Sequence, residues 1–213
     1  DISGFTRQDT YVWNGLLVDN SNYNIFESLN VHDNGAGMYI QNNSTGNLVL
    51  NCDFHHNYDP NTNGGNADGL DVAYVAAGTS NTVRGCRAWQ NSDDGFDAFE
   101  NRGFILFDNC WSWSNGYIPY TKTVSGNGEG FKLGSAGTGN SGTILRKVTN
   151  CLAFENNNSG FHQEEADCRM EFYNNVAYNN VEHGFLLNYL NRAHIAKNNI
   201  AFKNGNNQAV FGS

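Results

Sequence analysis

The strongest constraint on the fold is a short phrase that recurs along the chain. A small apolar run is followed by Asn or Cys, then by a small or aromatic residue, and then by an Asn that precedes a Gly and a bulky apolar residue. It occurs at 29–40, 51–57, 85–97, 109–115, 150–162, 174–180 and 198–204. Repeats of roughly 20 to 50 residues are typical of solenoids, in which each repeat is one coil that stacks on the next. We therefore expect a stack of similar coils.

Two columns of equivalent residues support this interpretation. One is an asparagine column, in which each side-chain amide can bond to its neighbours above and below: Asn34, Asn57, Asn91, Asn115, Asn156, Asn180 and Asn204. Two residues before each lies a ring: His32, His55, Trp89, Trp113, Phe154, Tyr178 and Phe202. Such columns predict ladders at a turn shared by every coil.

Short alternating stretches recur between Asn, Gly and Asp turns, whereas no window keeps a helical apolar period for three turns. Each expected strand has its counterpart one repeat later, which indicates parallel stacking rather than hairpins. We expect an all-β parallel β-helix of about eight coils, with the Tyr11–Leu17 region as the eighth. Residues 1–213 would form a single domain that lacks native N-terminal residues, because the chain opens at Asp1 without Met or a signal segment.

Composition narrows the range of partners. The formal charge of −9 argues against nucleic acid, whose phosphates need clustered Lys and Arg. No run of eighteen apolar residues is present, so we expect no membrane span. Cys52, Cys86, Cys110 and Cys151 share one repeat position, where coils about 4.8 Å apart are spaced too widely for a disulfide. We expect these thiols to be free and to behave as small hydrophobes.

One position departs from the repeat. Two residues after successive glycines the chain carries Tyr39, Asp71, Asp97, Lys132, His162 and Leu186, and just before those glycines it carries Ala36, Asp68, Asp94, Glu129, Ser159 and His183. The central coils therefore gather charge, with up to five carboxylates on two adjacent coils: Asp68, Asp71, Asp93, Asp94 and Asp97.

Carboxylates this close repel one another unless a cation or hydrogen bonds hold them. Several aspartate oxygens suit a hard cation, and Ca²⁺ accepts irregular oxygen shells. An ordinary solvated acidic patch is the alternative, since Asp-Gly is also a common turn dipeptide. That alternative does not explain Asp97 or Lys132, which lie beyond the turn.

At this point the chain resembles a known family. The runs NSDDGFDAFEN at 91–101, FDNCWSWSNGY at 107–117 and GNGEGFKLG at 126–134 resemble polysaccharide lyase family 9, over roughly residues 20–205. The resemblance implies a right-handed parallel β-helix and a lyase that acts on pectate or related uronate polymers. The chain departs from the family pattern at HQEEAD, 162–167.

The resemblance also implies a calcium site and a base. Carried over by position, the Ca²⁺ ligands are Asp68, Asp93, Asp94 and Asp97, with Asp71 as a rival to Asp68, and the Brønsted base is Lys132. Calcium would bridge the anionic protein and an anionic polymer and stabilise charge on the sugar carboxylate during β-elimination. A lysine that merely pairs with the aspartates is the alternative role for Lys132.

Flanking coils would supply substrate contacts, for which the candidates are Tyr39, His162, Gln163, Arg169, Tyr189 and Arg192. For a protein of this kind we expect an acidic polysaccharide as partner, a monomer, and secretion to the exterior or the periplasm. Two rival functions stay open. One is a β-helix glycoside hydrolase that uses an Asp pair, and the other is a non-catalytic glycan-binding or structural β-helix with a calcium site.

Overall fold

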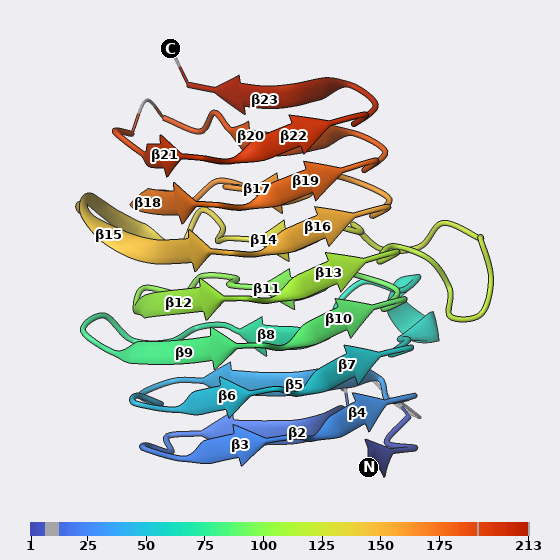
Figure 1. The fold of residues 1–213 in the computed structure, drawn as a ribbon. Coiled ribbons are helices and arrows are strands. Elements are labelled where there is room, and N and C mark those ends of the chain that lie inside the picture. The colour runs from blue at the N-terminus through green and yellow to red at the C-terminus, as the bar shows by residue number, and fades with distance from the viewer. Residues whose placement is uncertain (7–12, 191, 213) are drawn as a thin grey trace.

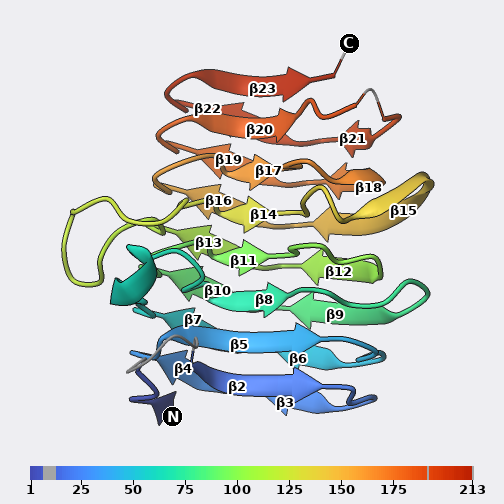
Figure 2. The same cartoon turned by 180° about the vertical axis from the view of Figure 1, so that it is seen from behind.

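The chain forms a parallel β-helix, which confirms the predicted fold class (Figure 1). The computed structural model describes residues 1–6, 13–190 and 192–212. Three parallel sheets run along the axis, and successive strands belong to the sheets in turn. The two termini lie at opposite ends of the stack (Figures 1 and 2).

Sheet A holds the middle of each repeat phrase, and its strands are β1 (Ile2–Ser3), β4 (Asn30–His32), β7 (Asp53–His55), β10 (Arg87–Trp89), β13 (Trp111–Trp113), β16 (Leu152–Phe154), β19 (Val176–Tyr178) and β22 (Ile200–Phe202). Sheet B follows the glycine of the phrase and contains β2 (Asn14–Asp19), β5 (Ala36–Gln41), β8 (Leu70–Val72), β11 (Phe96–Asp97), β14 (Phe131–Lys132), β17 (Phe161–His162), β20 (His183–Leu187) and β23 (Asn207–Phe211). Sheet C contains β3 (Ile25–Glu27), β6 (Leu48–Leu50), β9 (Ser80–Arg84), β12 (Phe104–Asp108), β15 (Gly139–Thr149), β18 (Asp167–Tyr173) and β21 (Ile195–Lys197).

The first strand of sheet B, β2, begins at Asn14. Part of the predicted N-terminal coil, Tyr11 and Val12, lies outside the described residues. The helical structure of the described residues is one 3-10 turn, η1 (Pro60–Thr62), in the excursion between β7 and β8. No described helix is long and apolar enough to cross a membrane.

The asparagine ladder is confirmed along the whole stack. The backbone N–H of Asn34 donates to Asn57 Oδ1, and from there each side-chain amide nitrogen donates to the side-chain oxygen of the next asparagine, in the order Asn57, Asn91, Asn115, Asn156, Asn180 and Asn204. The ring column is confirmed from His32 to Phe154, with neighbouring ring centroids 4.2 to 5.6 Å apart. These ladders fix the register of every coil at the turn between sheets A and B.

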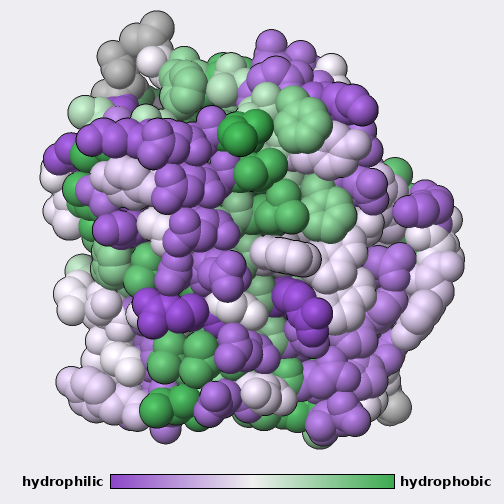
Figure 3. All heavy atoms as spheres, viewed as in Figure 1, coloured by the Kyte–Doolittle hydropathy of each residue, from purple (hydrophilic) through white to green (hydrophobic). Residues whose placement is uncertain are grey.

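The cysteine column points inward. Cys52, Cys86, Cys110 and Cys151 are buried and free, as is Cys168 of sheet C. They pack in one core with the apolar residues of all three sheets. On the face formed by sheets A and C, hydrophobic residues lie in small groups among hydrophilic ones (Figure 3). Sheet B faces the other way (Figure 2), and its outward side chains make the candidate site.

Candidate active site

The two-residue strands at the centre of sheet B set the direction of the charged side chains. Phe96, Phe131 and Phe161 are fully buried, and their rings stack with centroids 4.9 and 4.8 Å apart. Because side chains alternate along a strand, the residue after each Phe points out of the coil. The strand register pairs Asp97 with Asp71 on one side and with Lys132 on the other, which confirms the predicted column.

Glycine is required just before these strands. A Cβ on Gly95 would lie 2.0 Å from the hydroxyl oxygen of Ser112, and one on Gly130 would lie 2.6 Å from the carbonyl oxygen of Gly160. The close approach of neighbouring coils therefore excludes any side chain at these positions. It also keeps the carboxylates before and after each glycine within reach of the next coil.

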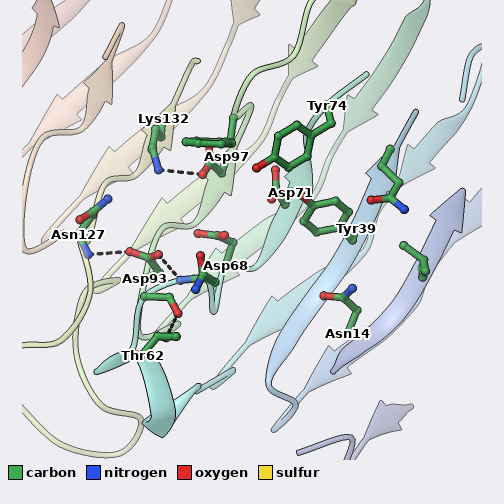
Figure 4. A pocket seen from close by; sticks show the side chains of 15 residues that line it. Asn14, Tyr39, Thr62, Asp68, Asp71, Tyr74, Asp93, Asp97, Asn127 and Lys132 are labelled. Atoms are coloured by element: carbon green, nitrogen blue, oxygen red, sulfur yellow. Dashed lines mark hydrogen bonds and ion pairs between the residues drawn. The ribbon is translucent and has the colours of Figure 1, made fainter. Parts of the chain in front are cut away.

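A cavity of about 820 Å³ opens over this part of sheet B. Figure 4 shows Asp68, Asp93, Asp97 and Lys132 on one side of it, and Asp71 beside Tyr39 and Tyr74 on the other. Its lining is Asn14, Leu17, Tyr39, Gln41, Thr62, Gly65, Asn66, Asp68, Asp71, Tyr74, Asp93, Asp97, Phe99, Asn127 and Lys132. The cavity thus joins carboxylates, a lysine, amides and aromatic rings.

Three aspartates form the centre of the site. Asp68, Asp94 and Asp97 each bring a carboxylate oxygen within 4.8 Å of the others, and all three are buried. Asp68 accepts from the backbone N–H of Asp94 at 3.0 Å, and Asp94 accepts from that of Glu129 at 2.6 Å. The backbone therefore holds two of these carboxylates in place.

Several oxygens of the cluster still have no donor. Within the described residues, Asp71 Oδ1 and Asp97 Oδ1 are buried without a hydrogen-bond partner, and Asp94 Oδ2 has only the ammonium of Lys132 nearby, at 3.4 Å. Buried carboxylate oxygens are normally satisfied, and leaving them unpaired is costly. The arrangement suits a cation with an oxygen shell.

The other two aspartates are held differently. Asp93 accepts from the backbone N–H of Asn66 and of Asn127, both at 2.6 Å. Asp71 lies beside Tyr39, whose contact lowers the pKa of that carboxyl against the larger raising effect of burial. The structure therefore places Asp68 rather than its rival Asp71 in the tight cluster. Asp93 is also buried and lines the cavity, and each of its oxygens accepts from a backbone amide.

Lys132 lies directly against the cluster. Its ammonium nitrogen is 2.9 Å from Asp97 Oδ2 and 3.4 Å from Asp94 Oδ2, and the residue is 7% exposed. It also lies 5.4 Å from the centre of the Phe99 ring. Burial lowers the pKa of Lys132, but Asp94, Asp97 and Asp68 together raise it above its ordinary value.

The carboxylates hold protons unusually tightly. Burial first, and then repulsion from neighbouring aspartates, raises the pKa of Asp68 and Asp94 well above the usual range. Burial also raises the pKa of Asp97 to about 7, although Lys132 opposes it. Hydrogen bonds or a bound cation would relieve repulsion of this kind between buried carboxylates.

Calcium fits this donor set. Each candidate ligand atom in the cluster is a carboxylate oxygen, which is the kind of ligand that hard cations prefer. Ca²⁺ takes six to eight oxygen ligands with flexible geometry. The residues that would hold it are Asp68, Asp94 and Asp97, with Asp93 close by.

The predicted substrate contacts separate into two groups. Tyr39 lines the cavity, whereas His162, Gln163, Arg169, Tyr189 and Arg192 do not. Gln163 is fully buried and donates its amide to the carbonyl oxygens of Ala166 and Tyr189, each at 2.9 Å. Arg169 donates to the carbonyl oxygen of Ala193, and Arg192 pairs with Asp167 at 2.5 Å. Gln163 and Arg169 belong to the coil of β17 and β18, and Tyr189 and Arg192 to the next coil, so these contacts join two coils beyond the cavity.

Sequence reasoning did not single out several residues of the cavity, and three of these carry an amide or an aromatic ring. Asn127, Tyr74 and Phe99 line it together with the charged cluster. Asn127 and Phe99 stand next to the GEGFK and DDGFD runs, so adjacency to those motifs was an available signal. Tyr74 has a left-handed backbone conformation with φ of 51°. No pattern in the sequence predicts that its side chain lines the cavity.

The fold and the site together define a class of protein. It is the class of parallel β-helix proteins that carry a buried cluster of carboxylates and a lysine on the outer surface of one sheet. Within that class, residues 1–212 match the family model described as the Pel9A-like, right-handed β-helix region. The chain belongs to this family.

Relatives agree with that assignment. "Pectate lyase L" of Dickeya chrysanthemi is 36% identical over 193 residues, which cover 89% of this chain and 44% of that protein. "Pectate lyase PEL9" of Emericella nidulans is 30% identical over 189 residues, 80% of this chain and 46% of that protein. The chain therefore spans about half the length of the curated relatives that it matches.

Two solved structures share the fold. One, "Rhamnogalacturonan lyase", superposes with a TM-score of 0.80 at 28% identity and covers 100% of this chain and 56% of its own. The other, "Crystal structure of pectate lyase Pel9A", gives a TM-score of 0.67 at 28% identity, with 94% of this chain and 52% of its own. The proteins similar to this chain therefore include some named pectate lyase and one named rhamnogalacturonan lyase.

Proposed function

We propose that this protein is a calcium-dependent polysaccharide lyase that cleaves a uronate-containing polymer by β-elimination, with Lys132 as the Brønsted base. The polymer is of the pectate or rhamnogalacturonan type, as the names of its relatives suggest. Enzymes that act on such polymers meet them outside the cell, so we also propose that the protein is secreted and acts as a monomer.

The observation that carries the proposal is the position of the Lys132 ammonium. It lies beside Asp94 and beside Asp97, whose other oxygen is buried without a hydrogen-bond partner among the described residues, at the wall of a cavity of about 820 Å³. A purely structural ion pair would pair its oxygens and would not need a cavity. A base that works beside a cation site needs carboxylate oxygens that are free to bind the ion and a cavity that admits the substrate.

Each group has a distinct task. Lys132 removes the proton on the carbon next to the sugar carboxylate and must first be neutral to do so. The aspartates oppose this by raising the pKa of the lysine, so their charge has to be offset before the base can act. Calcium held by Asp68, Asp94 and Asp97 would supply that offset and would stabilise the charge that develops on the substrate carboxylate. We therefore expect activity to rise into the alkaline range.

The surroundings of the cluster orient the sugar. Tyr39, Tyr74 and Phe99 offer ring faces and edges along the cavity, and Asn14, Gln41 and Asn127 offer amides. Sugars stack on aromatic rings through their apolar faces and bond to amides through their hydroxyls. The Tyr39 hydroxyl cannot act as an ionised base, because burial and Asp71 raise its pKa further above its usual value.

The test is Lys132→Ala assayed on polygalacturonate and on rhamnogalacturonan in the presence of calcium. Loss of a general base costs at least about a hundredfold in rate, so the ultraviolet-absorbing unsaturated product should disappear. Calcium binding, followed by calorimetry, should persist because the carboxylates remain. The matched control is Lys147→Ala, which removes an exposed lysine that pairs with Glu171 on sheet C at 3.8 Å.

Chelation separates the proposal from its rivals. With EDTA the wild-type protein should lose activity and regain it when calcium returns. Saturated products that resist EDTA would instead identify a hydrolase that uses an Asp pair. Calcium binding without cleavage of either polymer would identify a binding or structural β-helix. Full lyase activity of Lys132→Ala would refute the role of the base.

A further inference from the structure

A second group of ligating side chains lies one coil beyond the calcium candidate. Glu129 precedes the glycine before β14, His162 ends β17, and Glu164 follows in the HQEEAD run. His162 is the register partner of Lys132, so this group sits on the same face of sheet B. It does not line the cavity described above.

The three side chains converge on a single nitrogen. His162 Nδ1 is in hydrogen-bond contact with Glu129 Oε1, and it lies 3.1 Å from Glu164 Oε2. One ligand atom from each of the three residues can be chosen so that all lie within 4.8 Å of one another. Because both neighbours of Nδ1 are carboxylates, which only accept, Nδ1 carries the hydrogen that lies between them.

The single hydrogen on His162 Nδ1 cannot pair all the carboxylate oxygens of Glu129 and Glu164. Glu129 is 3% exposed, and its second oxygen, Oε2, is buried without a hydrogen-bond partner among the described residues. Its carboxylate is thus fully desolvated but only half paired, beside a second carboxylate from Glu164. Burial of a carboxylate in this condition is costly unless a further positive group is present.

We propose that Glu129, His162 and Glu164 form a second metal site that takes a first-row divalent ion of the zinc type. An imidazole nitrogen with two carboxylates matches zinc, whereas calcium selects oxygen donors alone. The metal takes the place of the hydrogen on Nδ1, which is released to solvent as the ion binds.

The geometry requires only a small adjustment. Metal–ligand bonds of about 2.1 Å place the donors of a tetrahedral site about 3.4 Å apart. The contact between His162 and Glu164, at 3.1 Å, is already near that separation, and the shorter contact to Glu129 lengthens when the shared hydrogen leaves. The side chains of His162 and Glu164 are 17% and 33% exposed, so an ion can enter from solvent and keep an open position.

The site is distinct from the calcium candidate but connected to it. The backbone N–H of Glu129 donates to Asp94 Oδ1, so the same residue braces the aspartate cluster with its backbone and would hold the second ion with its side chain. Zinc bound there would tie the coils of β14 and β17 together. The proposal does not depend on lyase activity.

The experiment is a calorimetric titration of the metal-stripped protein with Zn²⁺ in the presence of excess Ca²⁺, which occupies oxygen-only sites. The variants are His162→Gln and Glu164→Gln. The matched control is Glu165→Gln, which removes the same charge from the exposed neighbour of Glu164. Loss of one ligand should weaken zinc binding by at least about tenfold, since even outer-shell changes cost that much. The control should bind as the wild type does.

A second measurement tests whether zinc binds instead to the neighbouring, half-buried histidines His32, His55 and His56. Zn²⁺ should raise the melting temperature of the wild type and of Lys132→Ala, but not that of Glu164→Gln. Equal zinc affinity in all variants, or binding that survives in both His162→Gln and Glu164→Gln, would overturn the proposal. Because both readouts are independent of catalysis, failure here and failure of the proposed lyase function are told apart.

Discussion

Arg146 is the largest fully buried side chain of the described residues, and it has no carboxylate partner in contact. Its guanidinium donates to the carbonyl oxygens of Leu133 at 3.0 Å, Gly103 at 2.8 Å and Asn101 at 2.7 Å. Burial lowers the pKa of Arg146. The charge is therefore solvated by backbone, and it joins the coil of Lys132 to the coil of Asp97.

Replacement of Arg146 by Met should destabilise the protein by more than about 3 kcal/mol, because buried carbonyls lose their donor. Urea denaturation in calcium measures this. Arg84→Met is the control, since Arg84 is exposed and pairs with Asp108 at the surface at 3.0 Å, and an exposed pair contributes at most about 1 kcal/mol. Similar losses for the two variants would contradict the bracing role of Arg146.

The sequence predicted Asp97 and Lys132 because strand alternation and the glycine column place them without knowledge of the loops. It did not predict Arg146, since an arginine in a strand is usually exposed and its carbonyl partners come from turns. Nor did it predict that both oxygens of Asp93 are used by amides of two separate excursions. Contacts between equivalent positions of neighbouring coils could be predicted from the sequence. Contacts that depend on the path of a loop could not.

At the scale of elements, the asparagine ladder holds the turn between sheets A and B. Asn115 is fully buried, donates to Asn156 Oδ1 at 2.9 Å and accepts from Asn91 Nδ2 at 3.1 Å. The amide must donate in one direction and accept in the other. Only a side chain with both functions can continue such a ladder.

Asn115→Asp should therefore destabilise the fold at pH 7 by about 2 kcal/mol or more, because an ionised carboxylate cannot donate to Asn156 and is buried without a counter-ion. The loss should shrink near pH 4, where the acid can be protonated and donate again. Melting temperatures at the two pH values measure this. Asn206→Asp, at an exposed turn, should show little change at either pH.

The ladders also explain how far the elements were predictable. The strands of sheets A and B follow from a pattern repeated in every coil, so their parallel order and register were predicted correctly. The excursions 57–67 and 116–128 occur once each and contact one another through Ser125, Gly126 and Asn63. Because these excursions are not part of the repeat, the repeat pattern does not predict the contacts between them. These contacts bring Asn127 to the cavity.

At the scale of the whole molecule, the acidic cluster links stability to pH and calcium. Burial raises the pKa of Asp97 to about 7 and that of Asp68, Asp71 and Asp94 well above their usual value. The folded state then binds more protons than the unfolded state between the ordinary carboxylate pKa of about 4 and the raised pKa values. Stability of the calcium-free protein must fall as pH rises from about 4 through 7.

The raised pKa of Lys132 acts in the same sense, because its contribution to stability is also lost as pH rises, but it acts in another pH range. Its raised pKa stabilises the folded state fully at neutral pH, and that contribution changes only above the ordinary lysine value of about 10.4. Between pH 5 and pH 8 the carboxylates therefore set the slope. A cation that binds the ionised aspartates in the folded state alone reverses the loss by mass action.

We expect the melting temperature of the calcium-free protein to decrease from pH 5 to pH 8, and that of the calcium-loaded protein to stay nearly level. Each kcal/mol corresponds to about 2–4 °C for a chain of this size, so the gap between the curves should reach several degrees at pH 8 and narrow at pH 5. Asp97→Asn should flatten the calcium-free curve, because it removes one of the carboxylates that titrate in this range. Parallel curves with and without calcium would mean that the cluster does not bind the ion in its ionised form.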